Sequence, residues 1–294
     1  MTLTLDASPL PASPLRPADA HKGTFGTVVV VGGSAAMIGA PALSAGAALR
    51  SGAGLVKILT DPALVPAVLT LEPCATAILA GTSAMESLDR LTAADPDESA
   101  VLAIGPGMGQ SEYAFQLVEA LIGSSRHMVL DADALNILAQ IRPGGITALD
   151  RPQLVLTPHP GEFRRLAASL GILFSPTDPA QRPQAAAALA RAFNAIVLLK
   201  GKDTVISDGR KYRINHAANP AMATAGCGDV LTGLIAALMA QGQSAWQAAV
   251  LGAHLHSLAG ESWLREIGPS GMTAMDLLHR LPLAFQAHRQ HTDN

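Results

Sequence analysis

Aromatic side chains are scarce in this chain of 294 residues, which contains only 2 Trp, 2 Tyr and 6 Phe. A basic excess is also lacking, because 20 Lys and Arg are set against 23 Asp and Glu, for a formal net charge of −3. Nucleic-acid binding depends on a basic surface, and single strands are also held by stacking on aromatic rings. The composition therefore disfavours a nucleic-acid partner.

Cysteines and long apolar runs are missing as well. Two cysteines, Cys74 and Cys227, cannot build a disulfide framework or a four-cysteine metal site. Although 49% of the residues are hydrophobic, no apolar run approaches the roughly 20 residues of a membrane span. The N-terminus is interrupted by prolines and lacks the order of a signal peptide. We therefore expect a cytoplasmic protein without a membrane partner.

Aliphatic runs alternate with helical patterns along the chain, which is typical of a layered α/β fold with a mostly parallel sheet. Residues 1–22 form a proline-rich lead-in, for which we expect no regular structure, and residues 23–294 form a single domain. Strands are expected at 27–31, 55–59, 101–104, 128–130, 154–156 and 196–199, with a hairpin around 207–209. Helices are expected from 41 to about 52 and at 111–122, 133–140, 161–170, 179–193, 228–241, 244–265 and 273–290.

The segment from Thr224 to Gly233 is the most informative candidate site. Backbone N–H groups around Gly226, Cys227 and Gly228, together with the start of a helix, predict an anion hole for a phosphoryl group. Asp229 follows directly, where a carboxylate suits the removal of a hydroxyl proton during phosphoryl transfer. The alternative is that Asp229 only caps the helix and the glycines only form a turn. Two roles are open for Cys227: a small side chain that fills the turn, or a thiol whose pKa is lowered by the helix N-terminus.

Further polar segments follow predicted strands, where ligands bind in parallel α/β sheets. Residues 200–204 offer two lysines and a Thr hydroxyl to a nucleotide, or else form a solvated turn. His159, between two prolines, presents a ring to a ligand or serves the fold. Asp131 faces the site or Mg²⁺, or else caps the next helix.

Two glycine-rich segments do not match the standard phosphate-binding motifs. The segment 105–109 has the wrong glycine spacing for a dinucleotide turn, although close backbone approach to a ligand is compatible with it. The segment beginning at Gly32 lacks the Gly-Lys-Ser/Thr end of a P-loop. The standard metal-ligand and nucleophile motifs are missing too. His254 and His256, for example, are two residues apart on a predicted helix and therefore lie on different faces of it. We therefore assign no protein metal site from the sequence.

In order and content, these segments resemble the ADP/ATP-dependent NAD(P)H-hydrate dehydratases, whose ribokinase-like fold has three α/β/α layers. The resemblance covers the chain from about residue 21 to the last helix. It rests on Val30–Ser34 with Gly39–Pro41, Ala48–Val56, Gly105–Gly109, Asp131–Asn136, Thr157–Glu162, Lys200–Gly201 with Thr204, and Asn219–Gly233.

The resemblance implies repair of a damaged cofactor, the S epimer of hydrated NADH or NADPH. An adenine nucleotide, ADP or ATP with Mg²⁺, phosphorylates the ring hydroxyl, and phosphate then leaves. It implies contacts of the hydrated dinucleotide with Ala40, Gly107, His159 and Asp229. It implies contacts of the nucleotide with Lys200, Gly201, Lys202, Asp203, Thr204 and Gly228.

Two departures from the family pattern stand out: Cys227 replaces a small hydroxyl residue, and Ala218 replaces a glycine. Some relatives carry an epimerase domain before this one, and we expect this chain to supply only the dehydratase and to work with a separate epimerase. The resemblance also suggests a homotetramer. The alternatives are a vitamin-precursor kinase of the same fold, which leaves a stable phosphate ester, and a non-catalytic nucleotide sensor, which tolerates loss of Asp229.

Overall fold

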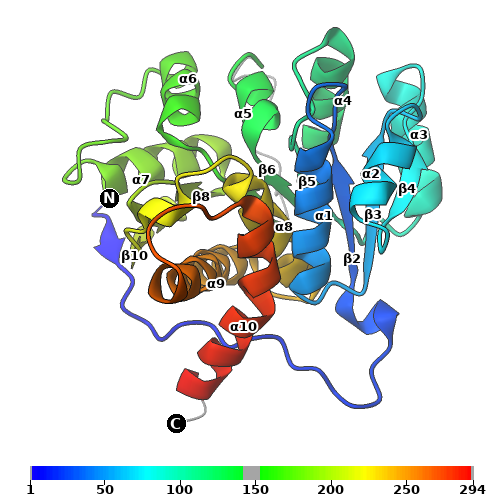
Figure 1. Ribbon diagram of the computed structural model, residues 1–294. Coiled ribbons are helices and arrows are strands. Elements are labelled where there is room, and N and C mark those ends of the chain that lie inside the picture. Colours follow the sequence, from blue (N-terminus) through cyan, green and yellow to red (C-terminus); the bar gives the residue numbers. More distant parts are fainter. Residues whose placement is uncertain (1, 142–152, 293–294) are drawn as a thin grey trace.

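The computed structural model describes residues 2–141 and 153–292, and the strands among them form one ten-stranded sheet (Figure 1). The strand order is β1-β10-β9-β8-β7-β6-β5-β2-β3-β4. The strands are β1 Thr4–Leu5, β2 Thr27–Val31, β3 Leu55–Thr60, β4 Thr76–Leu79, β5 Val101–Ile104, β6 Met128–Leu130, β7 Leu154–Leu156, β8 Ile196–Leu199, β9 Asp203–Ser207 and β10 Lys211–His216.

The sheet is parallel from β4 through β8, and only β9 runs antiparallel to its neighbours. Parallel strands carry all their carboxyl ends to one edge, so the polar segments that follow them gather there. The expected hairpin is confirmed: β9 pairs with β10 across a turn in which Gly209 has a φ of +88°. Such a φ favours glycine because it lacks a Cβ.

Helices cover both faces of the sheet. They are α1 Gly39–Arg50, α2 Val65–Leu71, α3 Ala84–Ala94, α4 Glu112–Ile122, α5 Ala132–Leu138, α6 Pro160–Leu170, α7 Arg182–Phe193, α8 Cys227–Ala240, α9 Ala245–Glu266 and α10 Ala274–Thr292, with short 3₁₀ turns at Lys22–Phe25 and Pro220–Met222. Alternate residues of β2 enter different cores: Val28 and Val30 pack with α1, α8, α9 and α10, whereas Val29 and Val31 pack with α3 to α7. This is the expected three-layer α/β/α arrangement.

The packing of α1 against α8 explains much of the alanine content. Ala42, Ala45 and Ala48 of α1 are buried, and Gly233 of α8 lies so close that an added Cβ would be 2.0 Å from the Ser44 carbonyl oxygen. The Ser44 hydroxyl in turn donates a hydrogen bond of 2.8 Å to the Asp229 carbonyl. Small residues therefore let α1 hold the first turn of α8 in place.

Some expectations about secondary structure are wrong. The lead-in does contain regular structure, because Thr4–Leu5 pairs in parallel with the edge strand β10; an edge strand offers free backbone groups that no local pattern reveals. The sequence reading also missed β4, α2 and α3, although Ser83 caps α3 by accepting the Glu86 N–H. Among the described helices, none is long and apolar enough to cross a membrane.

Candidate active site

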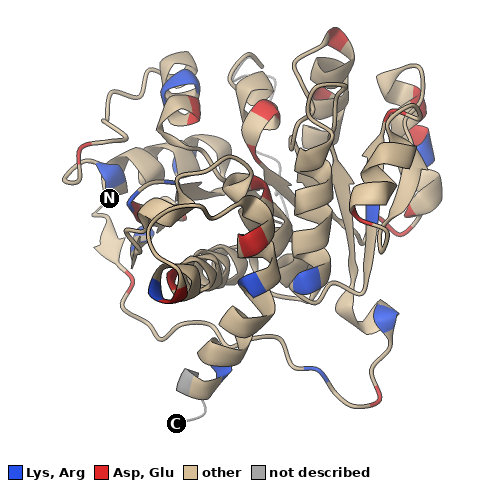
Figure 2. Ribbon diagram, viewed as in Figure 1, with Lys and Arg blue, Asp and Glu red and all other residues tan. Residues whose placement is uncertain are grey.

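A cavity of about 580 Å³ opens at the carboxyl ends of β6, β7 and β8 and over the start of α8. We call it the α8 cavity. It brings together segments that are far apart in the sequence, including nine predicted site residues: His159, Lys200, Gly201, Lys202, Thr204, Gly226, Cys227, Gly228 and Asp229. In Figure 2 the blue Lys and Arg positions and the red Asp and Glu positions are interspersed along the ribbon.

The first turn of α8 has the geometry of an anion hole. Gly226 is the N-cap with a φ of +89°, and no side chain caps the helix there. A Cβ on Gly226 would also lie 2.7 Å from the Ala274 Cβ, so both conformation and space require glycine. The first N–H groups of a helix lack intrahelical acceptors and carry the positive end of its dipole. They are therefore free to bind a phosphoryl group.

A partly buried histidine that lines the cavity contacts this turn. The Nε2 of His256, on α9, lies 2.9 Å from the Cys227 carbonyl oxygen. Burial lowers the pKa of His256 to about 4, so the ring is neutral and Nε2–H donates to the carbonyl. The sequence reading considered His256 only as a metal ligand. Its partner is a backbone carbonyl oxygen, and no sequence motif predicts such a contact.

Cys227 is itself buried, and burial raises the pKa of its thiol to about 11. The alternative of a lowered thiol pKa at the helix N-terminus is therefore wrong. The side chain packs in the core shared by α1, α8 and α9, which agrees with a role as small filler.

Lys200 lies between two buried carboxylates. Its Nζ is 2.6 Å from Asp131 Oδ1 and 3.8 Å from Glu162 Oε2. Burial opposes the charge of Lys200, but these carboxylates outweigh burial and raise its pKa. The other oxygen of Asp131 accepts a 2.7 Å hydrogen bond from the Thr232 hydroxyl.

The structure decides between the two roles considered for Asp131. Its side chain makes no capping bond to α5, so the helix-cap alternative is wrong and Asp131 belongs to the site. Glu162 and Thr232 were not among the predicted site residues. Glu162 lines the cavity beside Lys200, and Thr232 joins the site through its contact with Asp131.

His159 has a clear structural role. Its Nδ1 accepts from the Gly161 N–H at 2.9 Å and caps α6, while the Glu162 carboxylate accepts from the His159 N–H at 2.7 Å. Burial, followed by the charge of Lys200, lowers the pKa of His159. The ring is half exposed at the cavity, so its contact with a ligand stays a prediction.

Asp229 occupies an environment that disfavours a negative charge. Burial, followed by the charge of Asp131, raises its pKa to about 7. Its backbone carbonyl is engaged by Ser44, whereas its side chain lines the cavity beside the anion hole. A carboxylate with a pKa near neutrality is well matched to taking a proton from a hydroxyl group.

Three predicted residues lie outside the lining of the α8 cavity: Ala40, Gly107 and Asp203. The Asp203 side chain contacts His216 instead, at 3.0 Å. Gly107 has a φ of +61°, and an added Cβ would lie 2.5 Å from the Met37 carbonyl and 3.0 Å from the Ala40 Cβ. The fold itself therefore requires glycine at 107, whether or not a ligand approaches it.

Comparison with known proteins first defines the class. The fold resembles that of a ribokinase-like superfamily protein from Enterococcus faecalis, with a TM-score of 0.74, 27% identity and coverage of 93% of this chain and 91% of that one. Residues 28–283 match the family described as NAD(P)H-hydrate dehydratase. The chain therefore belongs to the NAD(P)H-hydrate dehydratase family, as the sequence motifs predicted.

Individual relatives agree with this assignment. The bifunctional NAD(P)H-hydrate repair enzyme Nnr of Moorella thermoacetica is 42% identical over 284 residues, which cover 93% of this chain and 52% of the relative. The enzyme of the same name from Escherichia coli is 37% identical, with 91% and 49% covered. The chain thus spans about half the length of these relatives. The ADP/ATP-dependent NAD(P)H-hydrate dehydratase of Bacillus subtilis, co-crystallised with ATP/Mg²⁺, has a TM-score of 0.77 and 29% identity, with 94% of each chain covered.

Proposed function

We propose that this chain catalyses the ADP- or ATP-dependent dehydration of the S epimer of hydrated NADH or NADPH and so restores the reduced cofactor. The observation that carries the proposal is the juxtaposition of Asp229, with its pKa raised to about 7, and the uncapped first turn of α8. A proton acceptor beside an anion hole is what transfer of a phosphoryl group to a hydroxyl requires. Family membership and the names of the relatives support the choice of substrate.

The chemistry has two steps. The ring hydroxyl oxygen attacks the terminal phosphorus of the nucleotide, the bond from that phosphorus to the leaving phosphate oxygen breaks, and Asp229 takes the hydroxyl proton. The carbon–oxygen bond of the new phosphate ester then breaks, inorganic phosphate departs, the neighbouring ring carbon loses a proton, and the ring double bond returns. The α8 N–H groups stabilise negative charge on the transferring group without reorganisation.

Lys200 has two tasks in this scheme. Its charge is shared between Asp131 and Glu162, so it holds two acidic side chains at a site that must also bind phosphates. It lies close to the anion hole as well, because a Cβ on Gly228 would be 3.4 Å from its Nζ. Lys200 therefore supplies positive potential to the phosphate site while pairing with Asp131.

The donor set also fits Mg²⁺. Asp131 and Glu162 offer carboxylate oxygens at the α8 cavity, and Mg²⁺ prefers oxygen ligands shared between one or two carboxylates and substrate phosphates. These two residues would hold the ion, which would neutralise charge on the nucleotide phosphates.

The decisive experiment mixes purified protein with hydrated NADPH, Mg²⁺ and either ADP or ATP. We expect dihydronicotinamide absorbance to recover only when a nucleotide is present, with inorganic phosphate released in equal amount. Accumulation of a stable phosphorylated dinucleotide would instead identify a kinase. Recovery without nucleotide would refute a phosphorylation mechanism.

The proposed function includes partners and location. A separate epimerase converts the R epimer into the substrate, the chain assembles as a homotetramer, and it works in the cytoplasm. Light scattering of the purified chain tests the tetramer, and a mixed-epimer substrate that is fully repaired only with added epimerase tests the pairing.

A further inference from the structure

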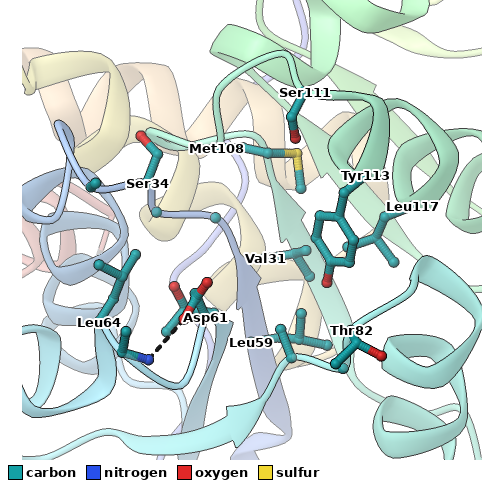
Figure 3. Close-up of a pocket in the computed structure, with 17 residues that line it drawn as sticks. Val31, Ser34, Leu59, Asp61, Leu64, Thr82, Met108, Ser111, Tyr113 and Leu117 are labelled. Atoms are coloured by element: carbon teal, nitrogen blue, oxygen red, sulfur yellow. Dashed lines mark hydrogen bonds between the residues drawn. The ribbon is translucent and has the colours of Figure 1, made fainter.

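A second cavity, of about 540 Å³, opens at the carboxyl ends of β2, β3 and β4 (Figure 3). We call it the β3 cavity. Figure 3 shows Met108, Tyr113 and Leu117 on one side of it, Leu64 on the other, and Asp61 between them. The Tyr113 hydroxyl lies 2.7 Å from the Ser87 Oγ, which fixes the ring in the wall. Apolar walls around a few polar groups are typical of a site for a small organic ligand.

The first turn of α1 connects the β3 cavity with the α8 cavity. Met108 lines the β3 cavity, and its neighbour Gly107 approaches Ala40 on α1. One turn further along α1, Leu43 approaches Gly226 at the mouth of the anion hole, where an added Cβ would be 2.8 Å from the Leu43 Cδ1. The first turn of α1 thus lies between the two cavities, and a dinucleotide whose reacting ring lies at Asp229 would reach the β3 cavity by crossing it.

The charge of the β3 cavity is unusual for a nucleotide site. Its 17 drawn lining residues include Asp61 but no Lys, Arg or His. The nearby Arg90 donates to the carbonyls of Leu79 and Ala80 and forms an ion pair with Glu86. Among the lining residues that the structure describes, Asp61 thus carries the only full charge.

Asp61 is held in a defined orientation. It follows β3 directly, and its Oδ1 accepts a 2.8 Å hydrogen bond from the Ala63 N–H, drawn as a dashed line in Figure 3. The second carboxylate oxygen has no bond of this kind to its own turn. A carboxylate after a parallel strand is well suited to accept hydrogen bonds from a ribose diol, whereas recognition of a 2′-phosphate calls for a nearby Arg.

We propose that the β3 cavity binds the adenosine half of the hydrated dinucleotide, that Asp61 accepts hydrogen bonds from its ribose hydroxyls, and that the enzyme therefore prefers hydrated NADH to hydrated NADPH. This inference rests on the proposed dehydratase function. A 2′-phosphate would place further negative charge beside Asp61 without a cation to pair with it. The apolar faces of Met108 and Leu117 suit a planar base.

The test compares kcat/KM for the two pure hydrates. We expect the wild-type enzyme to favour hydrated NADH by about tenfold or more, since a charge-assisted hydrogen bond is lost and a repulsion gained with the phosphorylated substrate. In Asp61→Asn, which keeps the acceptor for the Ala63 N–H, the preference should fall to within about threefold. The change should come from a higher KM for hydrated NADH, with kcat nearly unchanged.

Two further variants sharpen the test. Asp97→Asn removes an exposed charge outside the cavity and should leave the preference as in the wild type. Asp61→Ser, whose hydroxyl also accepts from the turn, replaces Asp61→Asn if the latter does not fold. Equal use of both hydrates by the wild type, or an unchanged preference in the Asp61 variants, would overturn this assignment while leaving the dehydratase function intact. Repair of neither hydrate would refute the proposed function itself.

Discussion

At the residue scale, Asp229 combines a chemical task with an unfavourable environment. Burial and then the nearby charge of Asp131 both disfavour its ionised form. The same features make the carboxylate basic enough to accept a proton near neutral pH. An ordinary helix cap would have no need of this environment.

Asp229→Asn separates the chemistry from the fold, because Asn has nearly the same size. We expect turnover to fall by about 10²–10⁴, the usual cost of losing a general base, with nucleotide affinity nearly preserved. In the wild type, turnover should fall as the pH drops below about 7, where Asp229 becomes protonated. Steady-state kinetics against pH measure both effects; a variant within a few-fold of wild-type turnover would mean that Asp229 is only a cap.

The ion pair of Lys200 and Asp131 yields a second prediction at this scale. Lys200→Met should destabilise the protein by about 3–5 kcal/mol, because it leaves a buried carboxylate without its partner. Adding Asp131→Asn should recover most of that stability but not nucleotide affinity. Urea unfolding measures the stability, and calorimetric titration with ADP measures the nucleotide affinity. Full recovery of affinity in the double variant would show that Lys200 does not contribute to the nucleotide site.

At the element scale, the first turn of α8 is held from two sides, by Ser44 of α1 and by His256 of α9. Neither contact involves the ligand-facing N–H groups. The turn is thus fixed through its carbonyls while its N–H groups stay available, which is the preorganisation that an anion hole needs.

His256→Ala should weaken the turn, because it removes the donor to the Cys227 carbonyl. A buried carbonyl that loses its donor costs about 1–3 kcal/mol, and the displaced N–H groups should bind ADP less tightly. The matched control is His279→Ala, which removes an exposed ring on α10. Thermal unfolding and ADP titration provide the readouts, and equal behaviour of the two variants would contradict the role assigned to His256.

The contact between α1 and α8 gives another prediction. Gly233→Ala places a methyl group 2.0 Å from the Ser44 carbonyl oxygen, so the helices must separate. We expect a loss of about 1–3 kcal/mol, as in other overpacked cores, together with reduced turnover because Asp229 shifts with α8. Gly39→Ala, where nothing lies within 4 Å of the added methyl, should leave stability unchanged or slightly higher. Equilibrium unfolding would refute the prediction if both variants behaved alike.

At the scale of the whole molecule, the active site lowers the free energy of unfolding. The pKa of Asp229 is raised from 3.8 to about 7 on folding, so between these pH values the folded state binds more protons than the unfolded state. The free energy of unfolding therefore loses a contribution as the pH rises from about 4 to 7.

The Asp229→Asn variant lacks this titration. Relative to the wild type, it should gain stability with rising pH, on the order of 1 kcal/mol or more at pH 8, and show no such gain near pH 4. Denaturant unfolding at the two pH values measures the difference. A constant difference in stability at both pH values would show that burial does not perturb Asp229.

Much of the fold could be read from the chain because the signals are local. The valine run of β2 and the apolar repeat of α8 follow from the spacing of apolar residues. Gly209 and Gly226 mark turns because their backbones need a positive φ. The sequence pattern did not predict β4, α2 or α3, because the apolar faces of these elements are narrow. In α2, for example, only Val68 is buried.

The sequence by itself determined the class of fold, the family, and the identity of the segments that meet at the carboxyl edge of the sheet. These properties depend on local backbone preferences and on the strand–helix order, which places successive loops at one edge. The tertiary structure decided which side chains meet there. Asp131 contacts Lys200 and Thr232 across 69 and 101 residues, and His256 reaches a backbone carbonyl. Such contacts depend on how the helices pack, because burial and long-range neighbours, not local spacing, set the pKa of Asp229 and the charge of each cavity.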